Sequence, residues 1–138
     1  MKQLVIFCLV SLFVFASCET TNIVYDDAIP IEEMASFQIS TSLKVNTFNS
    51  KEVNWTGAGG RKIFIPSGEH RLTVGLSNYK QGRYTYSGGN LGFIYDFKPG
   101  HLYYITITKV VNLHEITIRI TDRADNSSVD IDLGTGLN

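Results

Sequence analysis

The sequence predicts an all-β fold, a single antiparallel β-sandwich of seven to eight short strands, with a small open barrel as the alternative. Apolar and polar residues alternate with the two-residue period of a strand through most of residues 35–121. Turn signals rich in glycine, proline and asparagine recur about every eight to twelve residues. Two half-apolar sheets can bury their apolar faces only against each other, which favours the sandwich.

The length is that of one ordinary domain. The chain has 138 residues, and removal of a 17-residue leader would leave 121. With 43% hydrophobic and 18% charged residues, a core can form without disulfides. The formal net charge of -1 becomes -2 when Lys2 leaves with the leader, so the composition does not indicate a nucleic-acid partner.

Residues 1–17 have the order of features found in an export signal. Lys2 gives a basic start, residues 4–15 form a mainly apolar run, and Ala16 and Ser17 are small. The apolar run is too short to cross a hydrocarbon layer of ~30 Å as a permanent helix. We therefore predict a removable signal peptide.

The segment Phe15-Ala16-Ser17-Cys18 resembles the lipobox of bacterial lipoproteins, with Phe15 in place of the usual leucine. A residue other than leucine at this position of the lipobox is typical of spirochaete and Bacteroidetes lipoproteins. The resemblance implies cleavage before Cys18 and attachment of lipid to its thiol; the alternative is an ordinary secretory cut near the same place. Because Cys8 leaves with the leader, Cys18 would be the only cysteine of the mature chain, and two or three acyl chains would attach it permanently.

Residues 18–34 contain five acids, no base and one proline, without a clear period. We expect an acidic tether that starts at the lipidated cysteine and ends by docking on the domain. Residues 23–25 can form a short strand, whereas Pro30 suits an edge or a turn, and residues 31–35 show one weak helical turn.

The sandwich domain is expected over residues 35–121. Its pattern begins at residues 37–40, and residues 116–121 form its cleanest strand, with three isoleucines inward. Three hairpins are predicted from turn chemistry. They join residues 43–48 to 52–55 around Asn49-Ser50, residues 61–65 to 70–76 around Pro66-Ser67-Gly68, and residues 91–97 to 102–108 around Pro99-Gly100.

The remaining segments are predicted as connectors or as a tail. The glycine-rich stretches at residues 56–60 and 87–90 lack the setting of a phosphate-binding loop and are expected to be loops. Residues 122–138 form an acidic tail in which residues 129–133 alternate, so this segment is expected either to fray or to add one short strand.

Two turn regions resemble those of known envelope modules. Residues 65–74 look like a hairpin of PEGA-like β-sandwich modules, and residues 97–105 are similar to a proline-glycine strand turn of small envelope lipoproteins. Residues 24–30 resemble the opening of small treponemal lipoproteins. The resemblance implies a β-sandwich architecture and no particular chemistry.

Catalytic and metal-binding patterns are sparse, which predicts that the protein is not an enzyme and has no cofactor or bound metal. His70, His101 and His114 lie near turns or strand ends, without the local spacing of a helical zinc site. Residues 122–130 offer only part of a calcium loop. The mature chain has neither a Gly-x-Ser-x-Gly elbow nor an interior cysteine nucleophile.

Charge is unevenly distributed along the chain. Residues 44–119 contain ten bases and four acids, a difference of +6, while the tether and the tail hold the other nine of the 13 acids. A basic body can approach an anionic lipid surface. The alternative is that outward bases keep a sandwich soluble and protect its strand edges.

Aromatic residues provide one candidate ligand platform. Residues 79–87 contain Arg83, Tyr84 and Tyr86, and Trp55 is the single tryptophan of the chain. Aromatic rings stack on the apolar faces of sugars, and arginine supplies planar donors. The alternative is that these aromatic side chains pack within the sandwich.

Together these features predict a lipid-anchored lipoprotein of the bacterial cell envelope, placed in the outer membrane in preference to the inner one. Its expected role is that of a non-enzymatic interaction or structural module. Its expected partners are the membrane, through the N-terminal lipid, and envelope proteins or glycans. The alternative function is carbohydrate or peptidoglycan binding through Trp55, Arg83, Tyr84 and Tyr86.

Overall fold

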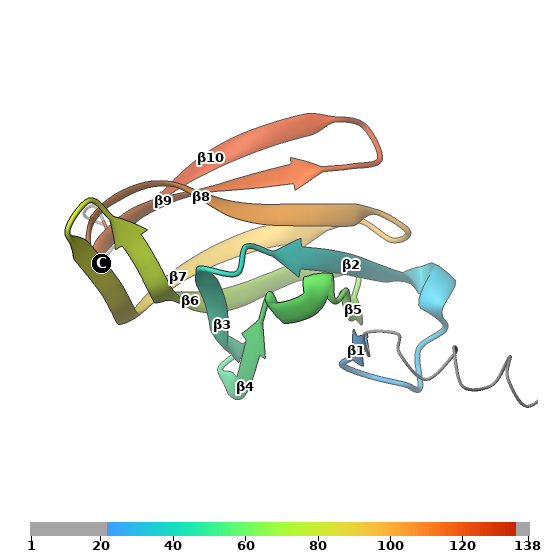
Figure 1. Cartoon of the computed structure of the whole chain (residues 1–138). Coiled ribbons are helices and arrows are strands. Elements are labelled where there is room, and N and C mark those ends of the chain that lie inside the picture. The colour runs from blue at the N-terminus through green and yellow to red at the C-terminus, as the bar shows by residue number, and fades with distance from the viewer. Residues whose placement is uncertain (1–21, 135–138) are drawn as a thin grey trace, which may run out of the picture.

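The computed structural model describes residues 22–134, which fold into two packed β-sheets (Figure 1). The signal peptide, Cys18 and the last four residues of the tail lie outside this range. One sheet has six strands in the order β1 (Ile23–Val24), β5 (Ile63–Pro66), β2 (Met34–Ile39), β8 (Leu102–Asn112), β9 (Glu115–Asp122) and β10 (Ser127–Leu133). The other has four, in the order β4 (Lys51–Thr56), β3 (Leu43–Phe48), β6 (Gly68–Gln81) and β7 (Tyr84–Phe97).

The all-β prediction is confirmed, and the two sheets do not form a closed barrel. Residues 22–134 contain ten strands rather than seven or eight, and two of them, β6 and β7, are 14 residues long. Two short 3₁₀ helices, η1 (Ile31–Glu33) and η2 (Ala58–Gly60), complete the described elements. Within the same residues, no helix is long and apolar enough to cross a bilayer.

Strand alternation places the core as predicted. In β9, Ile116, Ile118 and Ile120 are buried, while the residues between them face outward. The inward faces of both sheets meet in one apolar cluster rich in aromatic rings. Its largest fully buried side chains include Tyr103, Phe37, Phe48 and Phe97.

One of the three predicted hairpins forms. Strands β3 and β4 pair antiparallel around Asn49 and Ser50, which have φ angles of 50° and 70°. Positive φ at both central residues is the requirement of the tight turn that matches strand twist, and asparagine accepts it readily.

The other two predicted hairpins are wrong. The turn between Pro66 and Gly68 leads from β5 in the six-stranded sheet to β6 in the four-stranded sheet. The turn at Pro99-Gly100 leads from β7 back to β8 in the six-stranded sheet. Both turns reverse the chain as their chemistry predicts, but the strands that follow pair with partners from elsewhere in the sequence.

The sandwich is also not entirely antiparallel. Strand β2 pairs in parallel with β8, and β1 pairs in parallel with β5. The predicted strands at residues 23–25 and 129–133 form as β1 and β10, so the six-stranded sheet extends beyond residues 35–121 at both ends of the described chain.

The predicted loop at residues 87–90 lies inside β7. A Cβ atom on Gly89, whose φ is 90°, would lie 2.8 Å from the carbonyl oxygen of Leu113, and one on Gly75 would lie 2.5 Å from the carbonyl oxygen of Gly89. These glycines therefore permit close backbone approach within the sandwich and are not loop residues.

Candidate functional site

The most exposed aromatic residue group lies on the outer half of the β6–β7 hairpin, residues 77–87, which we call the distal hairpin. Two register shifts interrupt the β6–β7 ladder, one between Val74 and Leu76 and one between Leu76 and Tyr79. Such bulges bend strands and redirect side chains. The distal hairpin accordingly bends away from the rest of β6 and β7. It lies at the end of the molecule opposite β1 (Figure 1).

Three tyrosines share one face of the distal hairpin. Tyr79 is paired with Tyr86, and Tyr84 lies two residues before Tyr86 on the same strand. Tyr84 is 68% exposed, and its ring centroid lies 6.4 Å from that of Tyr86 at an interplanar angle of 40°. Tyr79 and Tyr86 are partly buried against the core. The face is therefore anchored at its base and open at its tip.

The turn of the distal hairpin is basic. Arg83 and Lys80 are both exposed, and no acidic residue occurs between His70 and Tyr95. Gly82, with a φ of 61°, allows the tight reversal. The exposed Arg83 directly precedes Tyr84, so its guanidinium can donate hydrogen bonds to a ligand at the turn.

A side-chain clamp fixes the base of the distal hairpin. The backbone N–H of Asn78 donates to Oγ of Ser87 over 3.0 Å, and this hydroxyl donates to Oδ1 of Asn78 over 3.1 Å. Asn78 has a φ of 50°, which marks it as part of the bulge. The clamp supplies the hydrogen bonds that a regular ladder would make at this bend.

Trp55 is not part of this surface. It is only 6% exposed and lies on β4, the edge strand farthest from β7 in the four-stranded sheet. Its ring contacts Phe48, with centroids 5.5 Å apart, and Tyr25, with centroids 5.8 Å apart. The structure thus pairs the rings of Tyr84 and Tyr86, places Arg83 at the turn of the same hairpin and keeps Trp55, the predicted fourth member, in the core.

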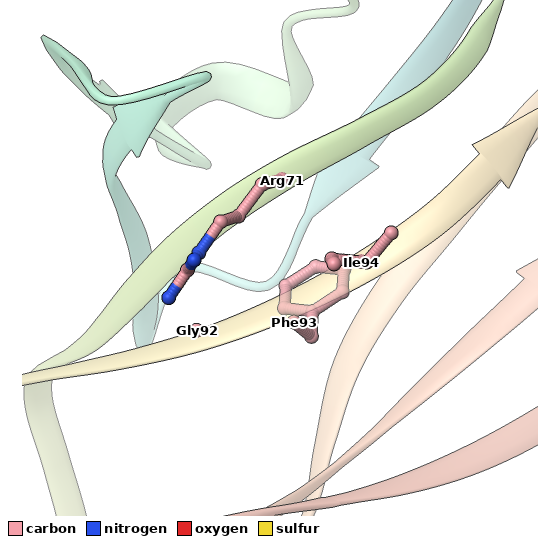
Figure 2. A pocket seen from close by; sticks show the side chains of 4 residues that line it. All are labelled: Arg71, Gly92, Phe93 and Ile94. Atoms are coloured by element: carbon pink, nitrogen blue, oxygen red, sulfur yellow. The ribbon is translucent and has the colours of Figure 1, made fainter. Parts of the chain in front are cut away.

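A second feature is a hollow on the outer face of β6 and β7, with a volume of about 270 Å³. It is lined by Arg71, Gly92, Phe93 and Ile94, and the Arg71 side chain extends from β6 toward Gly92 (Figure 2). Ile94 is 59% exposed, whereas Phe93 points inward and is buried. The hollow combines one cation with an apolar wall.

Comparisons with protein-family models, curated proteins and solved structures found no match to this chain.

The buried acid of the described chain, Asp122, serves a junction between turns. Nδ1 of His101 lies 2.7 Å from Oδ2 of Asp122, and the backbone N–H of Ala124 donates to Oδ1 over 3.0 Å. The carboxylate is 5% exposed and the imidazole 27%. Since both carboxylate oxygens have partners that hold the β7–β8 and β9–β10 turns together, the pair has a structural explanation.

Tyr103 and Tyr95 extend the same junction inward. The Tyr103 hydroxyl accepts a hydrogen bond of 2.8 Å from the backbone N–H of Lys98. Burial, and secondarily the charge of Asp122, raises the pKa of both tyrosines above its usual value. Neutral hydroxyls are therefore favoured here.

His70 is likewise held by a turn. Oδ1 of Asn49 accepts from the backbone N–H of Arg71 over 3.0 Å, so the Asn49 amide nitrogen faces Nδ1 of His70, 3.0 Å away. Nε2 of His70 then donates to the Pro66 carbonyl over 2.7 Å. Across residues 22–134, no group of three histidine, cysteine, aspartate or glutamate side chains is placed to hold a metal ion.

Sequence reasoning left Tyr79 out of the named site residues and missed Arg71 and Gly92. Tyr79 joins the tyrosine face through its cross-strand pairing with Tyr86. Arg71 and Gly92 line one hollow because β6 and β7 are paired, and a Cβ atom on Gly92 would lie 3.6 Å from a guanidinium nitrogen of Arg71. The register of the β6–β7 hairpin, set by the turn at Gly82-Arg83, is the signal that could have found both.

Proposed function

We propose that this protein is a lipid-anchored lipoprotein of the bacterial cell envelope that acts as a non-enzymatic interaction module. The observation that carries the proposal is the position of the distal hairpin, at the opposite end of the molecule from β1 (Figure 1). A chain tethered near β1 presents the exposed tyrosines away from its point of attachment. The resemblance of residues 15–18 to a lipobox supplies the anchor.

The start of the described chain is held firmly on the domain. Oδ1 of Asn22 accepts a hydrogen bond of 3.1 Å from the backbone N–H of Lys62, and β1 pairs with β5 immediately afterwards. Cys18 precedes Asn22 by four residues, a span of at most about 14 Å in an extended chain. A lipidated Cys18 would therefore keep the β1 end close to the bilayer and the distal hairpin away from it.

Mass spectrometry of the protein purified from bacterial membranes tests the anchor. We expect the mature chain to begin at Cys18 and to carry the mass of a diacylglyceryl group and its further acyl chains. A Cys18→Ser variant should retain its leader and lack the lipid. An unmodified Cys18 in the mature protein, or a leader retained by the natural chain, would contradict the proposal.

The proposed site of attachment is the outer membrane. The protein should then be recovered with that membrane when the two bacterial membranes are separated by density. Recovery in the inner-membrane fraction would correct this part of the proposal while leaving the anchor intact.

A second candidate function, binding of carbohydrate or peptidoglycan, is favoured by the Tyr84–Tyr86 ring pair beside Arg83. Stacking on one ring contributes about 0.5–1.5 kcal/mol, so Tyr84→Ala and Tyr86→Ala should each weaken binding to isolated peptidoglycan by roughly two- to tenfold. Tyr104→Ala is the matched control, because Tyr104 is 36% exposed on β8 in the other sheet. Equal binding by all three variants and the natural protein would exclude the distal hairpin as a glycan platform.

A further inference from the structure

We propose that the hollow at Arg71 binds a carboxylate group that carries a small apolar substituent. The site is separate from the distal hairpin and does not depend on the lipid anchor. Residues of the adjacent strands β6 and β7 line it, as Figure 2 shows, and Arg71, Gly92 and Ile94 each contribute a different element of recognition.

Among the described residues, the Arg71 side chain has no hydrogen-bond or ion-pair partner. Its backbone N–H donates to Oδ1 of Asn49, and its carbonyl accepts from the Asn49 backbone N–H over 2.8 Å, which fixes the strand at this point. The guanidinium itself makes no hydrogen bond or ion pair with any residue between 22 and 134. Five N–H donors in a rigid fork therefore remain for a ligand.

Gly92 creates the space in front of the guanidinium. A Cβ atom placed on Gly92 would lie 3.6 Å and 3.7 Å from two guanidinium nitrogens of Arg71, and 3.7 Å from the Thr73 methyl group. A branched side chain at this position would therefore occupy the hollow. The glycine is not required by its backbone, since its φ is not positive.

The local charges leave Arg71 available to an anion. The nearest acids on the same face by strand register are Glu69 and Asp96, which form the cross-strand pair next to Arg71 and Ile94. Figure 2 shows the arginine extending the other way, toward Gly92. On that side Thr73 is neutral, and its hydroxyl is already bonded to Thr47 over 2.6 Å.

A carboxylate fits this arrangement because its two oxygens match the fork of an arginine. The exposed side chain of Ile94 provides a surface for a methyl or short alkyl group attached to the carboxylate carbon. A volume of about 270 Å³ is below that of most drug-sized sites, so the ligand is a small acid or the end of a larger chain.

Titration calorimetry of the full-length protein in detergent tests the proposal with two probes. Isobutyrate represents a free small acid, and N-acetyl-alanyl-alanine represents the carboxylate end of a peptide. We expect binding of at least one probe at millimolar concentration, and none of N-acetyl-alanyl-alaninamide, which lacks the charge. Binding of the peptide alone would assign the site to a chain end, whereas equal binding of both would assign it to the carboxylate with its alkyl group.

Variants locate the binding. Arg71→Gln and Gly92→Val should each lower the affinity about tenfold or more, while Arg71→Lys, which keeps the charge without the fork, should have an intermediate effect. Arg119→Gln is the control, because Arg119 is exposed and paired with Asp130 on the other sheet. Unchanged thermal unfolding would show that the variants fold. Binding of neither acid, equal binding of the amide, or equal loss in the control would overturn the proposal.

Discussion

The distal hairpin and the junction at Asp122 use the same residue types in opposite ways. In the junction, Tyr103 is 1% exposed and its hydroxyl has a backbone donor, while Asp122 has partners for both oxygens. In the distal hairpin, Tyr84 is 68% exposed beside the exposed Arg83. Tyrosine is thus a packing residue in the junction and a surface residue in the distal hairpin.

This difference shows where recognition can occur. A buried polar group that has all its partners stabilises one arrangement of the chain and offers no free atom to a ligand. An exposed tyrosine or arginine with free donors makes little contribution to stability but has groups ready to bind. The junction therefore explains how the turns are held, and the distal hairpin and the Arg71 hollow are the surfaces on which function is proposed.

The largest expected contrast is between Tyr103→Ala and Tyr84→Ala. Loss of the buried Tyr103 ring and its hydrogen bond should lower the free energy of unfolding by on the order of 3–5 kcal/mol. Loss of the Tyr84 ring should change it by less than ~0.5 kcal/mol. Urea unfolding followed by circular dichroism measures both. Similar losses for the two variants would show that the distal hairpin is part of the core.

A smaller contrast is expected between two glycines of the β6–β7 hairpin. Gly89→Ala places a methyl group against the Leu113 carbonyl at a positive φ and should cost on the order of 2–4 kcal/mol. Gly82→Ala meets open space, so only the φ of 61° opposes it, at about 1 kcal/mol. Thermal unfolding distinguishes these costs. A milder effect at Gly89 than at Gly82 would contradict the close approach of β7 and the β8–β9 turn.

Local patterns predicted the strands better than their partners. The alternation that buries Ile116, Ile118 and Ile120 is a property of one strand, and the Asn49-Ser50 turn is determined by two adjacent residues, so both were visible in the sequence. The turns at Pro66 and Pro99 specify a reversal but not the sheet that the next strand joins, because that choice depends on the pairing of β6 with β3 and of β8 with β2.

The candidate site was predictable to the same extent. Arg83, Tyr84 and Tyr86 surround a glycine turn, so their exposure follows from local sequence. Trp55 is buried against Phe37 and Phe48 and also against Tyr25, which belongs to a segment predicted as a tether. The Arg71 hollow requires Gly92 from the neighbouring strand, and the sequence shows this only when the register of β6 and β7 is known.

A smaller difference in stability is expected between variants of Asp122 on β9 and Asp130 on β10. Asp122→Ala would leave the Ala124 N–H and the His101 ring without their acceptor in a buried site, at a cost of about 1–3 kcal/mol. Asp130→Ala removes an exposed partner of Arg119, and we expect no measurable change in stability. Urea unfolding measures both changes in stability. Equal changes for the two variants would show that Asp122 does not hold the two turns together.

The smallest expected effect is an alkaline one. The pKa of Tyr95 and of Tyr103 is raised in the folded protein, first because burial disfavours the tyrosinate and then because of Asp122. The proton is held more tightly in the folded than in the unfolded state, so the associated stability is fully present below about pH 10 and is lost as the pH rises through the folded pKa. In a titration of tyrosinate absorbance, Tyr95 and Tyr103 should contribute a late phase, above the usual pH of tyrosine ionisation. Tyr95→Phe should remove part of this late phase. An undiminished late phase in Tyr95→Phe would place Tyr95 outside the junction and remove its contrast with the distal hairpin.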